Sequence, residues 1–266
     1  MSTTVCLAGA TGWAGSELAR GLAGVDDLRL VSAVSRTHAG RDLGDVIGAP
    51  GLDVPVYATA EEALLHGCDV FFDYTQPTVA RRHVLAALRS GAHVVVGTSG
   101  ITDAEFDEID AVAREHGRGV LACGNFALTV VLLQRFAEAA ARLVPQWEIF
   151  DYAHADKADA PSGTARELAA RLARVRRPEP AVPIEQTVGP PEARGATMSG
   201  SQVHSVRLPG YVIGAEVVFG LPDQRLSLRY DGGSSARPYV DGALLAIREV
   251  AGLVGLHRGL DTVLDI

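Results

Sequence analysis

Lysine is almost absent from this sequence. Of its 24 basic residues, 23 are arginine and only Lys157 is lysine. An ε-ammonium is a compact group that can give or take a proton, whereas a guanidinium stays charged and favours planar, forked partners. A role in proton handling, or in binding a compact charge, therefore fits Lys157 better than a place on the surface. The alternative is that Lys157 has no special role and is the one lysine left by chance in an arginine-rich composition.

Cysteine is also scarce, and the histidines are scattered. Cys6, Cys68 and Cys123 show no CxxC spacing, so we expect buried free thiols rather than a disulfide framework or a structural metal site. The eight histidines likewise lack the short, regular spacings of metal ligands. The sequence therefore predicts no metal centre.

Excess positive charge and long apolar runs are missing as well. The formal net charge is -8 and the isoelectric point is near 5.5, so no nucleic-acid partner is expected, because such binders present a basic face. No apolar run reaches the roughly 18 residues that a membrane span needs, and the N-terminus lacks a signal-peptide pattern. We expect no membrane association and a cytoplasmic location.

Apolar residues are plentiful, and their spacing alternates between strand-like and helical. They make up 47% of the 266 residues, enough for the core of one large or two modest domains. The alternation predicts an α/β fold with a doubly wound parallel sheet of the Rossmann type, whose ligands bind beyond the carboxyl ends of the strands. The predicted strands are 4–8, 28–35, 69–73, 93–97 and 119–122, and the predicted helices are 14–23, 78–90 and 103–116.

A glycine-rich turn follows the first predicted strand. Its sequence, Gly9-Ala10-Thr11-Gly12-Trp13-Ala14-Gly15, is a GxxGxxG form of the dinucleotide-binding turn. Glycines there allow a tight turn and close approach of backbone to a pyrophosphate, and the start of the following helix favours its negative charge. The sequence therefore predicts a nucleotide site at this turn. Its expected members are Gly9, Thr11, Gly12, Trp13, Ala14 and Gly15.

The end of the second predicted strand bears on the choice of nucleotide. It reads Ser35-Arg36-Thr37, where a site selective for NAD usually carries an acidic residue for the ribose 2′-hydroxyl. Arg36 and Ser35, helped by Thr37 or Arg41, could instead bind a 2′-phosphate. We therefore expect NADPH as the preferred cofactor, with NADH as a possible one. The alternative is that Arg36 is only a solvated charge on a loop and does not bind the cofactor.

Three further strand ends carry small or polar residues. They are Asp73-Tyr74-Thr75-Gln76-Pro77, Gly97-Thr98-Ser99-Gly100 and Cys123-Gly124-Asn125-Phe126. Because the carboxyl ends of parallel strands share one edge of a sheet, these loops are expected to meet around ribose and nicotinamide. The cofactor-binding residues predicted here are Tyr74, Thr75, Gly97, Thr98, Ser99, Asn125 and Phe126.

The single lysine lies in a segment crowded with titratable groups. From His154 the chain runs Ala155-Asp156-Lys157-Ala158-Asp159-Ala160, and a Pro-Ser-Gly-Thr turn at 161–164 then leads into a helical pattern. Such a turn can present backbone N–H groups to an anion. The segment therefore predicts an anion site beside groups that can exchange protons.

These motifs together resemble the bacterial dihydrodipicolinate reductases, over nearly the whole chain. The segments 73–77 and 97–100 match the family's D-F-T-x-P and G-T-T-G, and 157–165 matches K-x-D-A-P-S-G-T-A. The resemblance implies a dinucleotide-binding domain at 1–124 and 234–266. An α+β substrate-binding and oligomerisation domain with an open mixed sheet would occupy 125–233. Its expected strands are 148–154, 202–207, 215–220 and 225–230; residues 178–191 are expected to form a loop, and the protein a homotetramer.

The resemblance also implies a reaction. Hydride would pass from the nicotinamide to a cyclic imine or enamine carboxylate, while Lys157, Ser162, Gly163 and Thr164 hold substrate carboxylates. Arg207 and Arg237 could hold a second carboxylate, but surface ion pairing explains them nearly as well.

One departure from the family puts the proton donor in question. Family members carry two histidines ahead of the lysine, the first being the donor, and here the pair reads Ala153-His154. Ala215 and Tyr230 also stand where members often carry histidines. His154 is therefore expected to act with Lys157 as a catalytic residue, with Tyr152 or water as other sources of the proton.

Three functions stay open from the sequence. The first, which we favour from the sequence, is a reductase of the same type acting on a divergent imine of specialised metabolism. The second is the lysine-biosynthesis reductase with a relocated proton donor. The third is a nucleotide-binding sensor or non-redox enzyme.

Overall fold

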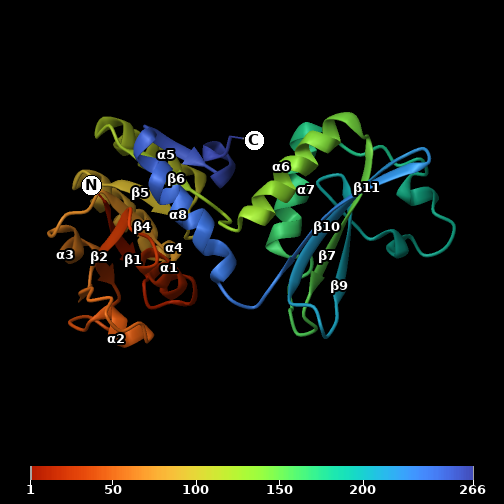
Figure 1. Cartoon of the computed structure of the whole chain (residues 1–266). Helices are drawn as coiled ribbons and strands as arrows, with labels where there is room; N and C mark the ends of the chain where they lie inside the picture. The colour runs from red at the N-terminus through yellow and green to blue at the C-terminus, as the bar shows by residue number, and fades with distance from the viewer. Residues whose placement is uncertain (1, 266) are drawn as a thin grey trace. The chain divides into compact units, whose positions relative to one another are not determined.

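The computed structural model describes residues 2–265, and its contacts divide the chain into two compact units. Unit 1 comprises Met1–Leu128 and Ala236–Ile266, and unit 2 comprises Thr129–Ser235. Unit 1 is thus built from two segments that are far apart in the sequence, as the red and dark blue parts of the ribbon show (Figure 1). No helix within residues 2–265 is long and apolar enough to cross a membrane.

Unit 1 contains a seven-stranded parallel sheet of order β12-β6-β5-β4-β1-β2-β3. The five predicted strands are present. The edge strands β3 and β12 were not predicted, because both are short and β12 comes from the C-terminal segment. The strands are β1 (Thr3–Ala8), β2 (Leu28–Val34), β3 (Val56–Tyr57), β4 (Val70–Asp73), β5 (His93–Val96), β6 (Gly119–Ala122) and β12 (Gly255–Arg258).

Helices pack on both faces of this sheet, so the predicted doubly wound architecture is confirmed. Cys6 and Ala8 of β1 join a core with α3, α4 and α5. The alternate residues Val5 and Leu7, also buried, face the side on which α1 and α8 contact each other. The helices are α1 (Trp13–Ala23), α2 (Leu43–Ile47), α3 (Ala60–Leu64), α4 (Pro77–Arg89), α5 (Asp103–Glu115) and α8 (Val240–Glu249).

Local signals fix where these helices begin. Thr102 and Glu105 form a capping box at α5, in which each side chain accepts a hydrogen bond from the other residue's backbone N–H. Pro77 opens α4, where its missing N–H costs no hydrogen bond. Both helices therefore start directly after the polar loops at the ends of β4 and β5.

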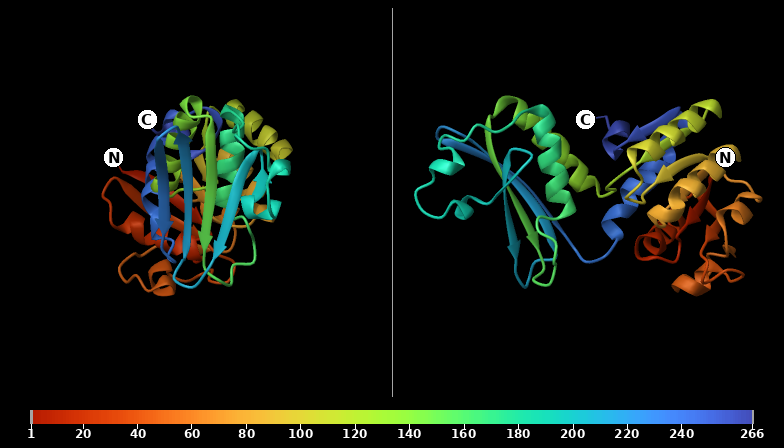
Figure 2. Two further views of the ribbon diagram at one scale, coloured as in Figure 1. Left: turned by 90° about the vertical axis from the view of Figure 1, so that its right-hand side faces the viewer. Right: turned by 180° about the vertical axis from the view of Figure 1, so that it is seen from behind.

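Unit 2 contains a five-stranded mixed sheet of order β11-β10-β7-β9-β8, in which β7 is parallel to β9 and antiparallel to β10. Helices α6 and α7 pack on one face, and Figure 2 (left) looks onto the other. The elements are α6 (Leu128–Leu143), β7 (Gln146–Ala153), α7 (Gly163–Val175), β8 (Ala196–Met198), β9 (Ser201–Arg207), β10 (Ile213–Leu221) and β11 (Gln224–Gly232).

The residues of β7 alternate strictly between the two faces. Trp147, Ile149, Asp151 and Ala153 are buried on the helix-covered face, and the residues between them are half-buried on the open face. Asp151 is therefore a carboxylate in an otherwise apolar row. The segment 176–195 that joins α7 to β8 is mostly irregular, with 3-10 turns at Ile184–Gln186 and Pro191–Arg194.

Candidate functional site

Two glycines of the first turn in unit 1 are required by close backbone contacts. Gly9 has φ +80°, and a Cβ at this position would lie 2.1 Å from the carbonyl oxygen of Tyr74. A Cβ at Gly15 would lie 2.1 Å from the carbonyl oxygen of Gly9. Gly12 is the N-cap of α1 and has no side chain to cap the helix. The first-turn amides of α1 are therefore left for an anion, as a pyrophosphate requires.

A cavity of about 320 Å³ lies beside this turn, within unit 1. It brings together eleven of the fifteen residues that the sequence predicted for the cofactor: Gly12, Trp13, Ala14, Gly15, Tyr74, Thr75, Gly97, Thr98, Ser99, Asn125 and Phe126. Four other residues line it: Pro77, Cys123, Gly124 and Tyr239. The first three lie in the quoted loops, whereas Tyr239 has no local signal, since it comes from the C-terminal segment.

The buried Asp73 fastens the loops after β4 and β5 together. Its carboxylate accepts hydrogen bonds from the backbone N–H and hydroxyl of Thr75, at 3.1 and 2.8 Å, and from the hydroxyl of Thr98. Nδ1 of the buried His83 on α4 lies 2.9 Å from the same carboxylate. The loops after β4 and β5 are thus held to each other by this one carboxylate.

One wall of the cavity is aromatic. The rings of Tyr74 and Phe126 meet edge to face, with centroids 5.7 Å apart, and a Cβ at Gly97 would lie 2.1 Å from the Tyr74 ring. Burial raises the pKa of Tyr74 and also that of Cys123, so both stay neutral. Such an uncharged wall fits a nicotinamide ring.

Gly9, Thr11, Ser35 and Arg36 do not line this cavity. Gly9 acts through the backbone contacts described above. The hydroxyls of Thr11 and Ser35 are 2.9 Å apart, which ties the turn to the end of β2. Arg36 is exposed, and no acidic residue occurs between Ser35 and Arg41. The end of β2 therefore presents hydroxyl and cationic groups only.

The lysine segment forms a second polar cluster, within unit 2. Lys157 donates to Asp159 at 2.6 Å, and its side chain is 24% exposed. Ser162 is the N-cap of α7 and accepts a hydrogen bond from Ala165 N–H. The N–H groups of Gly163 and Thr164 belong to the first turn of this 13-residue helix, which has no intrahelical acceptors for them. They are therefore available to an anion near the ammonium.

His154 and Tyr152, the two side chains proposed as proton sources, lie in different surroundings. His154 Nδ1 forms a hydrogen bond with Asp156, and this bond lowers the pKa of Asp156. The backbone N–H of Lys157 donates to the His154 carbonyl at 3.2 Å, so both belong to one tight turn. Tyr152 is on the open face, where its hydroxyl is 3.1 Å from Glu216; burial and Glu216 raise its pKa.

Ala153, Ala215 and Tyr230 lie on the helix-covered face of the sheet in unit 2. Ala153 is fully buried, and Asp151, Ala215 and Tyr230 are direct cross-strand neighbours on β7, β10 and β11.

Within residues 2–265 no group of three or more histidine, cysteine, aspartate or glutamate side chains could hold a metal ion.

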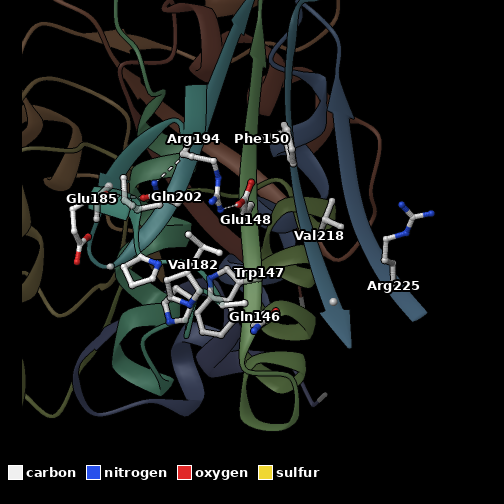
Figure 3. A pocket seen from close by; sticks show the side chains of 18 residues that line it. Gln146, Trp147, Glu148, Phe150, Val182, Glu185, Arg194, Gln202, Val218 and Arg225 are labelled. Atoms are coloured by element: carbon white, nitrogen blue, oxygen red, sulfur yellow. Dashed lines mark hydrogen bonds and ion pairs between the residues drawn. The ribbon is translucent and has the colours of Figure 1, made fainter. Parts of the chain in front are cut away.

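A larger cavity, of about 820 Å³, lies on the open face of unit 2 (Figure 3). Residues 178–185 cover part of the sheet there, and Glu148 pairs with Arg194 across it at 2.8 Å. Burial raises the pKa of Glu148, but its bonds to Arg194 and His204 outweigh this and the net pKa is lowered. No predicted site residue lines this cavity, so size alone does not identify the functional site.

Comparison with known proteins identifies the family. The family model for the dihydrodipicolinate reductase N-terminus matches residues 3–126, and that for the C-terminus matches residues 129–264. The 4-hydroxy-tetrahydrodipicolinate reductase of Moorella thermoacetica is 38% identical over 98% of this chain and 97% of its own length. The enzyme of that name from Halalkalibacterium halodurans is 36% identical, over 98% and 99%.

A solved structure agrees over the whole length. The dipicolinate-bound dihydrodipicolinate reductase from Paenisporosarcina sp. TG-14 superimposes with a TM-score of 0.89 at 30% identity, covering 99% of this chain and 100% of that one. With both halves matched, the chain belongs to the dihydrodipicolinate reductase family and is an NAD(P)H-dependent oxidoreductase.

Proposed function

We propose that this protein reduces 4-hydroxy-tetrahydrodipicolinate, a cyclic imine dicarboxylate, with NADPH. The observation that supports this proposal most is the composition of the segment 157–164. It contains one ammonium and two amides at a helix start, and it lies close in sequence to a histidine–aspartate pair. A dicarboxylate calls for that set of donors. The relatives named for this reaction, which match over nearly their whole length, favour this substrate over the divergent imine that the sequence suggested to us.

The cofactor residues provide a fitting site in unit 1. NADPH supplies a hydride when bound. The amides at the start of α1 would hold its pyrophosphate, and Gly9 and Gly15 allow the backbone to approach it closely. Tyr74 and Phe126 would orient the nicotinamide. At the end of β2, Ser35 and the exposed Arg36 would bind the 2′-phosphate, which is the basis for preferring NADPH.

The substrate residues act by charge and by proton supply. Lys157 would release Asp159 and pair with one substrate carboxylate, which the N–H groups of Gly163 and Thr164 and the Thr164 hydroxyl would also bind. The imidazole of His154, held by Asp156, would donate the proton that the reduced substrate needs, because Ala153 cannot. Tyr152 is a poorer donor, since its hydroxyl is already bonded to Glu216 on the open face of the sheet.

A divergent imine stays the second candidate. Ala153, Ala215 and Tyr230 give the helix-covered face a composition without the histidines expected there.

We also propose a homotetramer joined through the open sheet of unit 2, whose half-buried Phe150 and Val218 line the larger cavity (Figure 3). Light scattering of the purified protein would test the oligomer.

The deciding experiment is NADPH oxidation with dihydrodipicolinate synthase generating the substrate in the same cuvette. Turnover at rates ordinary for enzymes, about 1–1,000 per second, would support the lysine-biosynthesis reaction with a relocated donor. Bound NADPH without turnover would point to the divergent imine or to a non-redox role. NADH in place of NADPH is the matched control for cofactor preference.

A further inference from the structure

We propose that Asp151 and Arg207 are positioning residues that hold the carboxylate-binding segment 157–164 in shape. This proposal rests on the proposed function, because it assigns a task within the same site. Neither residue was predicted for this task, and Arg207 was considered only as a direct carboxylate ligand or a surface ion-pair partner.

Asp151 reaches the segment at its C-terminal end. Its fully buried carboxylate accepts a hydrogen bond from the backbone N–H of Ser162 at 2.8 Å and from the hydroxyl of Ser205 at 3.2 Å. Ser162 is the N-cap residue of α7. Asp151 thus fixes the residue immediately before the two amides that would bind the substrate.

Arg207 reaches the same segment three residues earlier. One terminal nitrogen, Nη2, donates to Asp151 at 2.7 Å and to the carbonyl oxygen of Asp159 at 2.7 Å. The other, Nη1, donates to the carbonyl oxygens of Asp151 and Val206. Both terminal nitrogens of the guanidinium are therefore occupied by the protein, which argues against a direct bond from them to a second substrate carboxylate.

Together the two side chains connect to both charged residues of the segment, directly to Asp159 and through it to Lys157. Asp159, whose carbonyl Arg207 holds, accepts the ammonium of Lys157 through its own carboxylate. Asp151 joins this end to Ser162. One buried pair thus sets the spacing between the ammonium and the amides of Gly163 and Thr164.

Stability alone does not account for the pair. Removing two charges from water costs about as much as their attraction returns unless every polar atom is bonded. Here Asp151 Oδ1 and Arg207 Nε are buried and have no hydrogen-bond partner among the described residues. Burial raises the pKa of Asp151, but the bonds from Ser162 and Arg207 outweigh it and the net pKa is lowered. The carboxylate is therefore ionised at neutral pH and available to hold the turn.

Hydrogen–deuterium exchange of Asp151→Asn tests the positioning without any substrate. We expect exchange in peptides covering 157–165 to rise at least about tenfold, while the rest of unit 2 stays near wild type. Ser201→Ala is the matched control, because it removes the 3.0 Å bond from Trp147 Nε1 to another buried polar residue of this unit, whose partner is not in the segment. Unchanged exchange in 157–165, or an equal rise throughout unit 2, overturns the proposal.

Binding and kinetics then test the consequence for the site. For Asp151→Asn and Arg207→Lys we expect the Kd of dipicolinate and the KM of the imine to rise about 10- to 100-fold, with the Kd of NADPH within about twofold of wild type. If Asp151→Asn does not fold, Arg207→Lys carries both tests. A wild type that neither turns over nor binds dipicolinate contradicts the proposed function, while exchange still decides the positioning role. Unchanged Kd and KM in a variant with faster exchange overturn the link to the site.

Discussion

The two units provide for their ligands in opposite ways. In unit 1 the cavity depends on backbone: glycines that exclude a Cβ, amides at the start of α1, and hydroxyls fastened by the buried Asp73. In unit 2 the proposed substrate site depends on pairs of polar side chains, namely Lys157 with Asp159, His154 with Asp156, and Asp151 with Arg207. A cofactor shared by many enzymes can be held by main-chain geometry, whereas one particular dianion is distinguished by charges. The cavity in unit 1 should therefore be sensitive to substitutions that add side-chain bulk. The proposed site in unit 2 should be sensitive to substitutions that remove a charge.

The largest expected effect is that of Gly15→Ala on the cofactor. The new Cβ would lie 2.1 Å from the Gly9 carbonyl oxygen, which is backbone and cannot turn aside, so the turn must deform. We expect NADPH binding, followed by nicotinamide fluorescence, to become too weak to measure. Gly24→Ala is the control, since its Cβ would come no closer than 3.4 Å to its neighbours. Tight NADPH binding by Gly15→Ala would show that bulk is tolerated in unit 1.

Loss of the proposed proton donor should come next. His154→Asn is expected to lower kcat by about 100-fold or more, because a positioned general acid is removed. Tyr152→Phe, which removes the hydroxyl bonded to Glu216, should leave kcat within about threefold. The reverse order of these two variants would move the donor to Tyr152.

Loss of the lysine charge tests the other half of the comparison. Lys157→Ala should lower kcat/KM about 10- to 100-fold, since a charged hydrogen bond contributes about 1.5–3 kcal/mol. The Kd of NADPH should stay within about twofold. Lys157→Arg sharpens the question, because it keeps the charge but not its compact shape. Full activity of Lys157→Arg would make charge, rather than lysine, the requirement.

A smaller effect is expected at the end of β2. Arg36→Ala should reduce the ratio of kcat/KM with NADPH to that with NADH by about tenfold, because one charged contact to the 2′-phosphate is lost. Arg29→Ala is the control, being exposed at the other end of the same strand. Equal losses with both cofactors would contradict a role at the 2′-phosphate.

The smallest effect concerns acid stability. The pKa of Asp151 is lowered in the folded protein, so its contribution to stability is present above the ordinary aspartate value, about 3.9, and disappears as pH falls through the lowered pKa. The difference in unfolding free energy between wild type and Asp151→Asn should therefore be larger at neutral pH than near pH 3. Denaturant unfolding followed by circular dichroism at both pH values measures it.

How much of the structure the sequence could predict depends on how far apart in the chain the interacting residues lie. The strand–turn–helix motifs are local, so the five strands of unit 1 and most residues of its cavity could be predicted. Tyr239 could not, since α8 brings it to the cavity from the C-terminal segment. Asp151 and Arg207 are 56 residues apart, and only the parallel pairing of β7 with β9 brings them together.

One structural feature that we did not predict could have been predicted from the sequence. Alternation along β7 already separates Tyr152 from Asp151, because neighbouring residues of a strand face opposite sides. The task of Asp151 was hidden for a different reason: a lone carboxylate in an apolar row carries no motif, and its meaning comes from Ser162 and Arg207.

The place of β12 has a consequence for how the protein is made. On the ribosome β6 emerges long before β12, so its edge, with unpaired N–H and C=O groups, stays open while all of unit 2 is synthesised. The contiguous unit 2 can finish folding first, although the chain began with unit 1. Slow translation beyond residue 235 would prolong the exposure of that edge, and the nascent chain at this stage is where a chaperone would have the most to protect.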